Sequence, residues 1–179
     1  MQDVIYMDNA ATTRTSREVV ESMIPYFTEH YGNASALYSF AQDAKIGLEN
    51  ARKQVAKVIG AKSEEIYFTA GGSEADNWAI KATAEFLKAK GNHIITSKIE
   101  HHAVLHSCQY LEQHGYEVTY LDVDEYGMIN LDELKAAIRP TTILITIMFA
   151  NNEIGTIEPI KAIGAIAKEK KLLFFCDAT

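Results

Sequence analysis

The stretch Ile143–Met148, with the sequence Ile-Leu-Ile-Thr-Ile-Met, decides how this chain folds. It is a short apolar run rich in β-branched residues, and polar and apolar positions do not alternate along it. Such a run is typical of a strand that is buried on both faces of a parallel sheet. Parallel strands need crossover connections, which are usually helices. The stretch therefore predicts an α/β protein whose helices cover both faces of one sheet.

The segments on either side alternate between strand and helix patterns. We expect strands over residues 66–69, 93–97, 117–121, 142–149 and 172–176. We expect helices over residues 17–30, 39–59, 73–90, 101–114, 131–138 and 159–170. Right-handed crossovers join such strands into a largely parallel sheet. Because the sequence has no internal repeat, low-complexity segment or linker-like stretch, it predicts a single domain.

Composition limits the classes of function. The 179 residues are 47% hydrophobic and 23% charged, and their formal net charge is −7 at pH 7. This acidic balance argues against a nucleic-acid partner, and no apolar run approaches the roughly 20 residues of a membrane span. The two cysteines, Cys108 and Cys176, form neither a disulfide framework nor a CxxC pair. We therefore expect a soluble, reduced, cytoplasmic protein without a membrane partner.

Ligands of open parallel sheets bind outside the carboxyl ends of the strands, so the residues after each strand are the candidate site. Gly71, Gly72 and Ser73 stand between an expected strand and a helix. Glycines let the backbone approach a ligand, and a serine at a helix start adds a hydroxyl to free N–H groups, which suits a phosphate. The alternative is an ordinary turn with a serine cap. The spacing fits neither a Walker loop nor the dinucleotide fingerprint.

Histidines follow the strand expected over residues 93–97. His101 can stack on a planar ring or transfer protons, and the alternative is a solvated or capping histidine. His102 and His106 stand at i and i+4, which is metal-ligand spacing on a helix. No third ligand is evident nearby, and the Glu of an HExxH motif is absent. We therefore expect no metal site.

Two further strand ends carry polar residues. Asn151 and Asn152 follow the central buried stretch, where adjacent amides either form turns with their own backbone or present a donor and an acceptor to a ligand. Asp177 follows five apolar residues. A carboxylate is costly to bury there unless a cation or strong donor meets it, and a protonated heterocyclic nitrogen is such a partner. The alternative is an aspartate in a surface turn.

The four positions together match one ligand. It carries a phosphate, a flat ring, a hydroxyl or oxyanion, and a basic ring nitrogen. Pyridoxal 5′-phosphate (PLP) has all four features, so the residues point to PLP as the cofactor.

Six motifs, in order along the chain, resemble those of NifS/IscS-type cysteine desulfurases. They are Asp8–Thr13, Tyr31–Asn33, Phe68–Asn77, Ile99–Val104, Asn151–Thr156 and Asp177–Thr179. This family belongs to the class V aminotransferase branch of the PLP-dependent aspartate aminotransferase fold, also called fold type I. Its members convert L-cysteine to L-alanine and hold the sulfur as an enzyme persulfide. The sulfur then serves iron–sulfur cluster assembly, tRNA thiolation and related pathways.

The resemblance implies a role for each candidate residue. Gly72 and Ser73 would hold the cofactor phosphate. His101 would stack on the pyridine ring and assist proton transfer. Asn152 would face the ring oxygen of the cofactor and the carboxylate of the substrate. Asp177 would pair with the pyridinium nitrogen and keep it protonated, so that the ring can accept electrons.

The resemblance also implies an organisation. Residues 1–14 would form an N-terminal segment near the active site, with Asn9 and Ala10 on the substrate side of the pocket. Residues 15–179 would form the N-terminal part of the PLP-binding large domain, a three-layer fold that is incomplete here. The implied partners are L-cysteine, an iron–sulfur scaffold or another sulfur-acceptor protein, and a second copy in a homodimer.

The sequence departs from the family pattern in two ways. Ala34 and Tyr38 stand where the family usually has Pro and His, and Gly72-Ser73 stands where Ala-Thr is common. More seriously, the Ser-Xaa-His-Lys motif with the covalent cofactor lysine, the substrate-binding Arg, the loop with the nucleophilic Cys and the small domain are not in these 179 residues.

We therefore expect the chain alone to be inactive, and two alternatives remain. One is another class V enzyme, such as a selenocysteine lyase or an aminotransferase. The other is a non-catalytic α/β module that binds a ligand or forms a dimer. Neither Cys108, on a helix, nor Cys176, in a buried strand where a thiolate is disfavoured, is expected to replace the sulfur-accepting cysteine.

Overall fold

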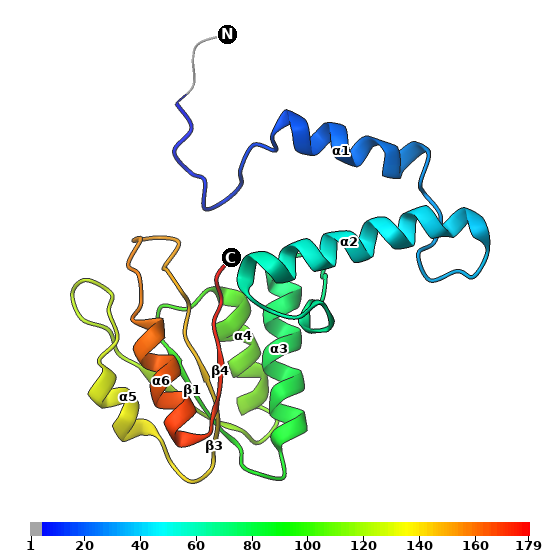
Figure 1. The fold of residues 1–179 in the computed structure, drawn as a ribbon. Helices are drawn as coiled ribbons and strands as arrows, with labels where there is room; N and C mark the ends of the chain where they lie inside the picture. The colour runs from blue at the N-terminus through cyan, green and yellow to red at the C-terminus, as the bar shows by residue number, and fades with distance from the viewer. Residues whose placement is uncertain (1–4) are drawn as a thin grey trace. The chain divides into compact units, whose positions relative to one another are not determined.

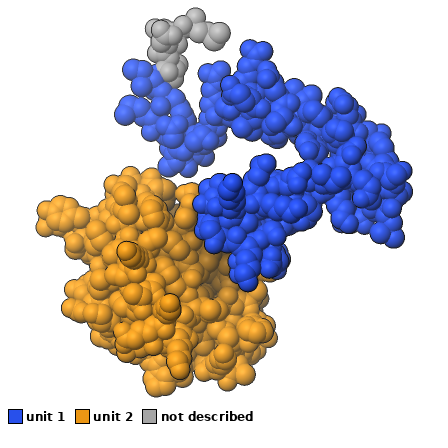
Figure 2. All heavy atoms as spheres, in the orientation of Figure 1, with its two compact units in different colours: residues 1–68 blue, residues 69–179 orange. Residues whose placement is uncertain are grey.

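The computed structural model describes residues 5–179, so the first four residues of the predicted N-terminal segment lie outside the described residues. The chain divides into two compact units, Met1–Phe68 (unit 1) and Thr69–Thr179 (unit 2), which Figure 2 colours separately. Within the part that the structure describes, no helix combines the length and apolar character needed to cross a membrane.

Unit 2 is built on a four-stranded parallel sheet (Figure 1). Its strands are β1 (His93–Ser97), β2 (Glu117–Leu121), β3 (Thr142–Thr146) and β4 (Leu173–Phe175). Their order in the sheet is β2-β1-β3-β4, and each neighbouring pair is parallel. The predicted α/β class with a largely parallel sheet is thereby confirmed.

Helices cover both faces of this sheet. One face packs against α3 (Gly72–Leu87) and α4 (His102–Glu112), and the other packs against α5 (Leu131–Ala137) and α6 (Ile160–Lys170). Successive strand residues point to opposite faces. Accordingly Ile94 and Leu144 enter the first core, and Ile95 and Ile145 enter the second. All five residues of β3 are buried, as the apolar stretch predicted.

The strand predicted over residues 66–69 is wrong. The short 3-10 helix η2 (Ser63–Glu65) precedes it, and the Ile66 N–H donates to the Ser63 carbonyl at 3.2 Å. The Arg52 guanidinium donates to the Ile66 carbonyl. A strand needs a neighbouring strand to pair with its backbone, and no described strand pairs with these residues. Apolar character alone therefore did not make a strand.

β3 and α3 are shorter than predicted. β3 ends at Thr146 rather than at residue 149, because the Met148 N–H donates to the Glu100 carboxylate instead of to β1. α3 ends at Leu87 rather than at residue 90, because the N–H groups of Lys88 and Lys90 donate to carbonyls three residues earlier, those of Glu85 and Leu87, which tightens the chain into a turn.

The described part of unit 1 consists of helices and their connections. α1 (Arg17–Thr28) begins after Ser16, whose hydroxyl accepts the Val19 N–H at 3.4 Å. The short 3-10 helix η1 (Ser39–Ala41) leads into α2 (Gln42–Ile59). Gly60 ends α2 in the left-handed conformation, with φ of 71°, which a glycine adopts without strain. The helix expected over residues 17–30 is present but ends at Thr28, and the one expected over 39–59 is confirmed with a 3-10 first turn.

Candidate functional site

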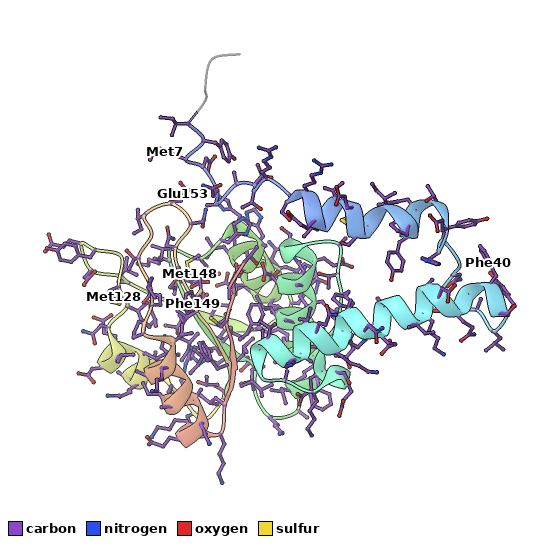
Figure 3. The ribbon with its side chains drawn as sticks, turned by 45° about the horizontal axis from the view of Figure 1, so that its top comes forward. Met7, Phe40, Met128, Met148, Phe149 and Glu153 are labelled. Carbon is purple, nitrogen blue, oxygen red and sulfur yellow. The ribbon has the colours of Figure 1, made fainter. Side chains whose placement is uncertain are left out.

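Three strands of unit 2 deliver predicted site residues to one edge of the sheet. β1 is followed by His101, β3 by Asn152 and β4 by Asp177. Figure 3 shows Glu153 on the loop that leaves β3. Because parallel strands place their carboxyl ends at the same edge, residues that lie far apart in the sequence come together here.

Asp177 is fixed and buried at this edge, with 8% of its surface exposed. The Phe149 N–H donates to the Asp177 carbonyl at 2.7 Å, which continues the pairing of β3 with β4 beyond Phe175. The Asp177 Oδ1 accepts the Thr179 N–H at 3.0 Å. Among the described residues this is the one hydrogen bond to the carboxylate, and a single neutral donor does not offset the cost of burying a charge.

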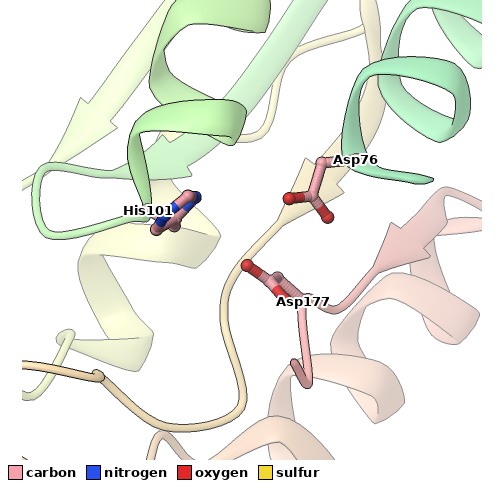
Figure 4. Close-up of side chains that lie close together, drawn as sticks. All are labelled: Asp76, His101 and Asp177. Atoms are coloured by element: carbon pink, nitrogen blue, oxygen red, sulfur yellow. The ribbon is translucent and has the colours of Figure 1, made fainter. Parts of the chain in front are cut away.

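His101 and Asp76 join Asp177 in one cluster (Figure 4). A potential ligand atom from each of the three side chains lies within 4.8 Å of the other two. His101 is the N-cap of α4, and its Nδ1 accepts the Ala103 N–H at 3.2 Å. In the neutral ring the proton is then on Nε2. The expected meeting of His101 and Asp177 is therefore present, and Asp76 is an unexpected third member.

The three side chains of this cluster are of types that bind metals, but the hydrogen bond of His101 is not that of a metal ligand. A metal-bound histidine normally donates its other ring N–H to an acceptor, whereas the His101 Nδ1 accepts an N–H. The rings of His102 and His106 stack with centroids 5.5 Å apart. No further His, Cys, Asp or Glu of the described chain completes a ligand set with that pair. We assign no metal to either group.

Gly72 and Ser73 begin α3 beside the end of β4. A Cβ atom on Gly72 would lie 2.8 Å from the Thr179 Oγ1, so a residue without a side chain permits this close approach. The N-cap, Gly71, provides no side-chain hydrogen bond to the helix. The first N–H groups of α3 therefore remain available to an anion, which helix N-termini bind well. This geometry is compatible with the predicted phosphate site.

The two asparagines after β3 have different environments. Asn151 is buried, its Nδ2 donates to the Ile99 carbonyl at 2.8 Å, and its Oδ1 accepts the N–H groups of Glu153 and Ile154. It therefore ties this loop to the segment before His101. Asn152 is exposed, and its amide contacts only the Glu153 carboxylate, at 3.3 Å, among the described side chains.

The predicted roles of Asn152, Asn9 and Ala10 remain predictions. Asn9 and Ala10 lie in an exposed turn of unit 1, in which the Ala11 N–H donates to the Asp8 carbonyl at 3.2 Å.

Sequence reasoning missed Glu100. It is 5% exposed, and its Oε1 accepts the Ser97 hydroxyl at 2.6 Å and the Met148 N–H at 3.1 Å. Its Oε2 is buried and has no hydrogen-bond partner among the described residues. Burial raises the pKa of Glu100 to about 7. Its position directly before His101, at a strand end, is the sequence signal that points to it.

Sequence reasoning also missed Asp76, although the helix pattern contained a signal. Asp76 stands four residues before Ile80 and eight before Ala84, on the face of α3 that enters the core. An acid on such an apolar face is unusual. Burial, and next the charge of Asp177, raise the pKa of Asp76 to about 6, while His101 acts in the opposite direction.

The sheet edge has too few positive charges for its acids. Asp76, Glu100 and Asp177 are all buried, and none of them takes part in an ion pair formed by the described residues. A cationic ring nitrogen next to Asp177 would supply the missing charge, and the start of α3 would accept a phosphate. The residues present therefore fit PLP.

This architecture and site define a three-layer α/β protein of the PLP-dependent fold type I class. The chain belongs to the class V aminotransferase family, whose family model matches residues 5–179. Enzymes of this family depend on PLP.

Solved structures agree with this placement. A NifS-like protein superposes with a TM-score of 0.95 at 41% identity, over 98% of this chain and 49% of the other. SspA in complex with cysteine gives a TM-score of 0.93 at 43% identity, over 97% and 50%.

Curated relatives include IscS cysteine desulfurases. The protein of Methanosarcina thermophila is 60% identical over 174 residues, which are 97% of this chain and 43% of the relative. That of Clostridium botulinum strain Hall is 57% identical over 178 residues, which are 99% and 45%. The recognised resemblance to NifS/IscS-type proteins is thereby confirmed. The chain spans less than half the length of these relatives, and it corresponds to their N-terminal part.

Proposed function

We propose that this chain is the N-terminal part of a PLP-dependent cysteine desulfurase, which converts L-cysteine to L-alanine and retains the sulfur as an enzyme-bound persulfide. The observation that carries the proposal is Asp177, a buried carboxylate that faces His101 at the carboxyl edge of the sheet and lacks a cation among the described residues. The IscS relatives support the choice of reaction, and one similar structure was solved with cysteine.

Each residue of the sheet edge has a role in this proposal. Gly72 and Ser73 bind the phosphate through backbone N–H groups and the serine hydroxyl. Asp177 holds a proton on the ring nitrogen, and His101 packs on the ring and moves a proton. Asn152 binds the ring oxygen and the substrate carboxylate. When bound, PLP supplies an electron sink for the negative charge that develops on the substrate.

The wider organisation follows the same proposal. Residues 15–179 form the N-terminal part of the PLP-binding large domain. Residues 1–14 lie near the active site, with Asn9 and Ala10 on the substrate side. The enzyme works as a cytoplasmic homodimer that passes its sulfur to an iron–sulfur scaffold or another acceptor protein. The free thiols of Cys108 and Cys176 agree with a reducing compartment.

Cofactor binding tests the proposal directly. Pyridoxamine 5′-phosphate is a suitable probe, because it has the ring nitrogen and phosphate of PLP but no aldehyde to react with surface lysines. Asp177→Asn removes a charge-assisted hydrogen bond, which contributes roughly 1.5–3 kcal/mol, so the dissociation constant from fluorescence titration should rise about 10- to 100-fold. The matched control is Asp132→Asn, on an exposed helix start, which should leave it unchanged. Equal affinities of the Asp177→Asn variant and the unaltered chain would refute the proposed site.

We also propose that the 179-residue chain does not turn over cysteine by itself. Burial raises the pKa of Cys108 to about 12 and that of Cys176 to about 11, so neither offers the thiolate that accepts sulfur. The sequence has no Ser-Xaa-His-Lys motif. Incubation of the purified chain with PLP and L-cysteine should release no alanine or sulfide above a protein-free control. Turnover that depends on the chain would contradict this.

A further inference from the structure

Asp76 is a buried acid for which the proposed chemistry has no role so far. It is 3% exposed, and its carboxylate makes no hydrogen bond with the described residues. In Figure 4 its carboxylate points from α3 toward that of Asp177. The two carboxylates and the His101 ring lie within 4.8 Å of one another. An acid with this placement needs a proton or a cation.

The two carboxyl groups cannot both ionise easily in the free chain. Like charges at this separation, away from water, favour a state in which one group keeps its proton. Of the two, Asp76 is the more suitable proton carrier, because the Asp177 Oδ1 already accepts the Thr179 N–H at 3.0 Å. A hydrogen bond from an N–H group stabilises the charged form of a carboxyl.

We propose that Asp76 is a second carboxyl group of the cofactor-ring site, which shares one proton with Asp177 and loses it when a cationic ring nitrogen binds. The inference rests on the proposed function, because it takes PLP as the ligand. In the binding step the O–H bond of the Asp76 carboxyl breaks, the electron pair stays on the oxygen, and the proton goes to solvent water. The ring nitrogen arrives already protonated, so charge and atoms balance. Asp76 is thus a positioning residue, which places a second negative charge beside Asp177 when the cation is bound.

The charged neighbours of Asp76 agree with this assignment. Burial is the largest cause of the raised pKa of Asp76, and the charge of Asp177, which follows β4, is the second. His101, at the start of α4, lowers this pKa. The pKa of Glu100 is raised first by burial and, as a smaller cause, by the charge of Asp177. Lys81 belongs to the same helix, but its Nζ donates to Asn77 at 2.7 Å and lies over the Tyr110 ring.

Carbon NMR of the 179-residue chain with labelled aspartate carboxyl groups tests the proposal. The Asp76 resonance is assigned by its loss in Asp76→Asn. In the free chain it should titrate near pH 6. Saturation with pyridoxamine 5′-phosphate should lower this midpoint by more than one pH unit. Over pH 5 to 6, the dissociation constant should fall with rising pH in the unaltered chain and change less in Asp76→Asn.

Two variants separate the shared proton from burial alone. In Asp177→Asn the Asp76 midpoint should fall in the free chain, and the probe should no longer move it. Asp132→Asn, which removes an exposed carboxyl of the same unit, should leave the midpoint and its response unchanged.

The outcomes distinguish the inference from the function on which it rests. If the probe binds but the Asp76 midpoint does not move, the inference is wrong and the proposed function stands. If the probe does not bind at any pH, the proposed function fails, and the cation step fails with it. The free-chain midpoint of Asp76, compared between the unaltered chain and Asp177→Asn, still decides whether the proton is shared.

Discussion

Unit 1 and unit 2 use similar amphipathic helices in different ways. In unit 2, α3, α4, α5 and α6 each bury apolar residues against the sheet. In unit 1, α1 has no buried residue and α2 buries only Ala56. Large apolar side chains of unit 1 remain exposed, among them Phe27 at 72% and Val58 at 85%. An apolar helix face therefore becomes a core only where a second layer covers it.

The strongest test of this contrast removes the same side chain from each unit. Ile94 in β1 is fully buried, whereas Ile46 in α2 is 56% exposed. Ile94→Ala should lower the free energy of unfolding by roughly 2–5 kcal/mol, through lost burial and the cavity left behind. Ile46→Ala should lower it by less than about 0.5 kcal/mol. Urea unfolding of both variants measures the difference, and equal losses would remove the distinction between the units.

A second test uses the buried acids, which among the described residues all belong to unit 2. Burial raises the pKa of Glu100 from 4.5 to about 7 and that of Asp76 from 3.8 to about 6. The stability that each of these two shifts contributes is fully present below the pKa that the acid has in the unfolded chain. It is lost as the pH rises through the pKa that the acid has in the folded chain. Burial lowers the pKa of His93 from 6.5 to about 4, so its contribution is lost as pH falls through that window. Burial also raises the pKa of Glu158. Since these acids outweigh one histidine, the free energy of unfolding should fall by about 2 kcal/mol or more between pH 5 and pH 7.

Glu100→Gln isolates the largest part of this pH dependence. A glutamine keeps an oxygen that accepts from Ser97 and Met148 but has no proton to lose. The variant should therefore show a flat or rising free energy of unfolding from pH 5 to pH 7, measured by urea unfolding at each pH. Glu100→Ala is the matched comparison, because it leaves both donors without their acceptor and should be destabilised at every pH. A Glu100→Gln variant that keeps the original slope would mean that Glu100 is already ionised.

Local features of this molecule were predictable from the sequence, whereas features that depend on pairing between segments were not. The strands 93–97 and 117–121 were predictable, because local patterns determine them, whereas the burial of Asp177 was one of two alternatives that the sequence left open. The strand expected over residues 66–69 failed, because pairing depends on a neighbour that local pattern cannot supply.

Only part of the candidate site was predictable from the sequence. Asp177 and His101 stand at strand ends, so the topology of a parallel sheet brings them together. Asp76 comes from within a helix, and only the packing of α3 against this edge places it there. Glu100 was missed for a similar reason, since its two hydrogen-bond donors lie on β1 and on the segment after β3.

Thiol reactivity tests how well the core of unit 2 stays closed, because both cysteines belong to this unit. With a pKa raised by burial to about 11, Cys176 is about 0.1% thiolate at pH 8, against roughly a quarter for an unperturbed cysteine. A disulfide reagent should therefore modify it about 200-fold more slowly in the folded chain than in urea. Cys108, with a pKa of about 12, should react more slowly still. Cys108→Ser and Cys176→Ser give the two rates separately, and a fast native reaction at either site would show that unit 2 opens readily.

The smallest effect should come from an ion pair on the surface of unit 2. The Lys98 Nζ lies 2.5 Å from the Asp122 carboxylate, but the two side chains are 55% and 74% exposed. Exposed pairs of this kind contribute about 0–1 kcal/mol, since water and salt screen them. Lys98→Ala should therefore change the free energy of unfolding by less than about 1 kcal/mol, and less again in high salt. A loss as large as that of Ile94→Ala would show that charge at the surface, rather than burial against the sheet, separates unit 2 from unit 1.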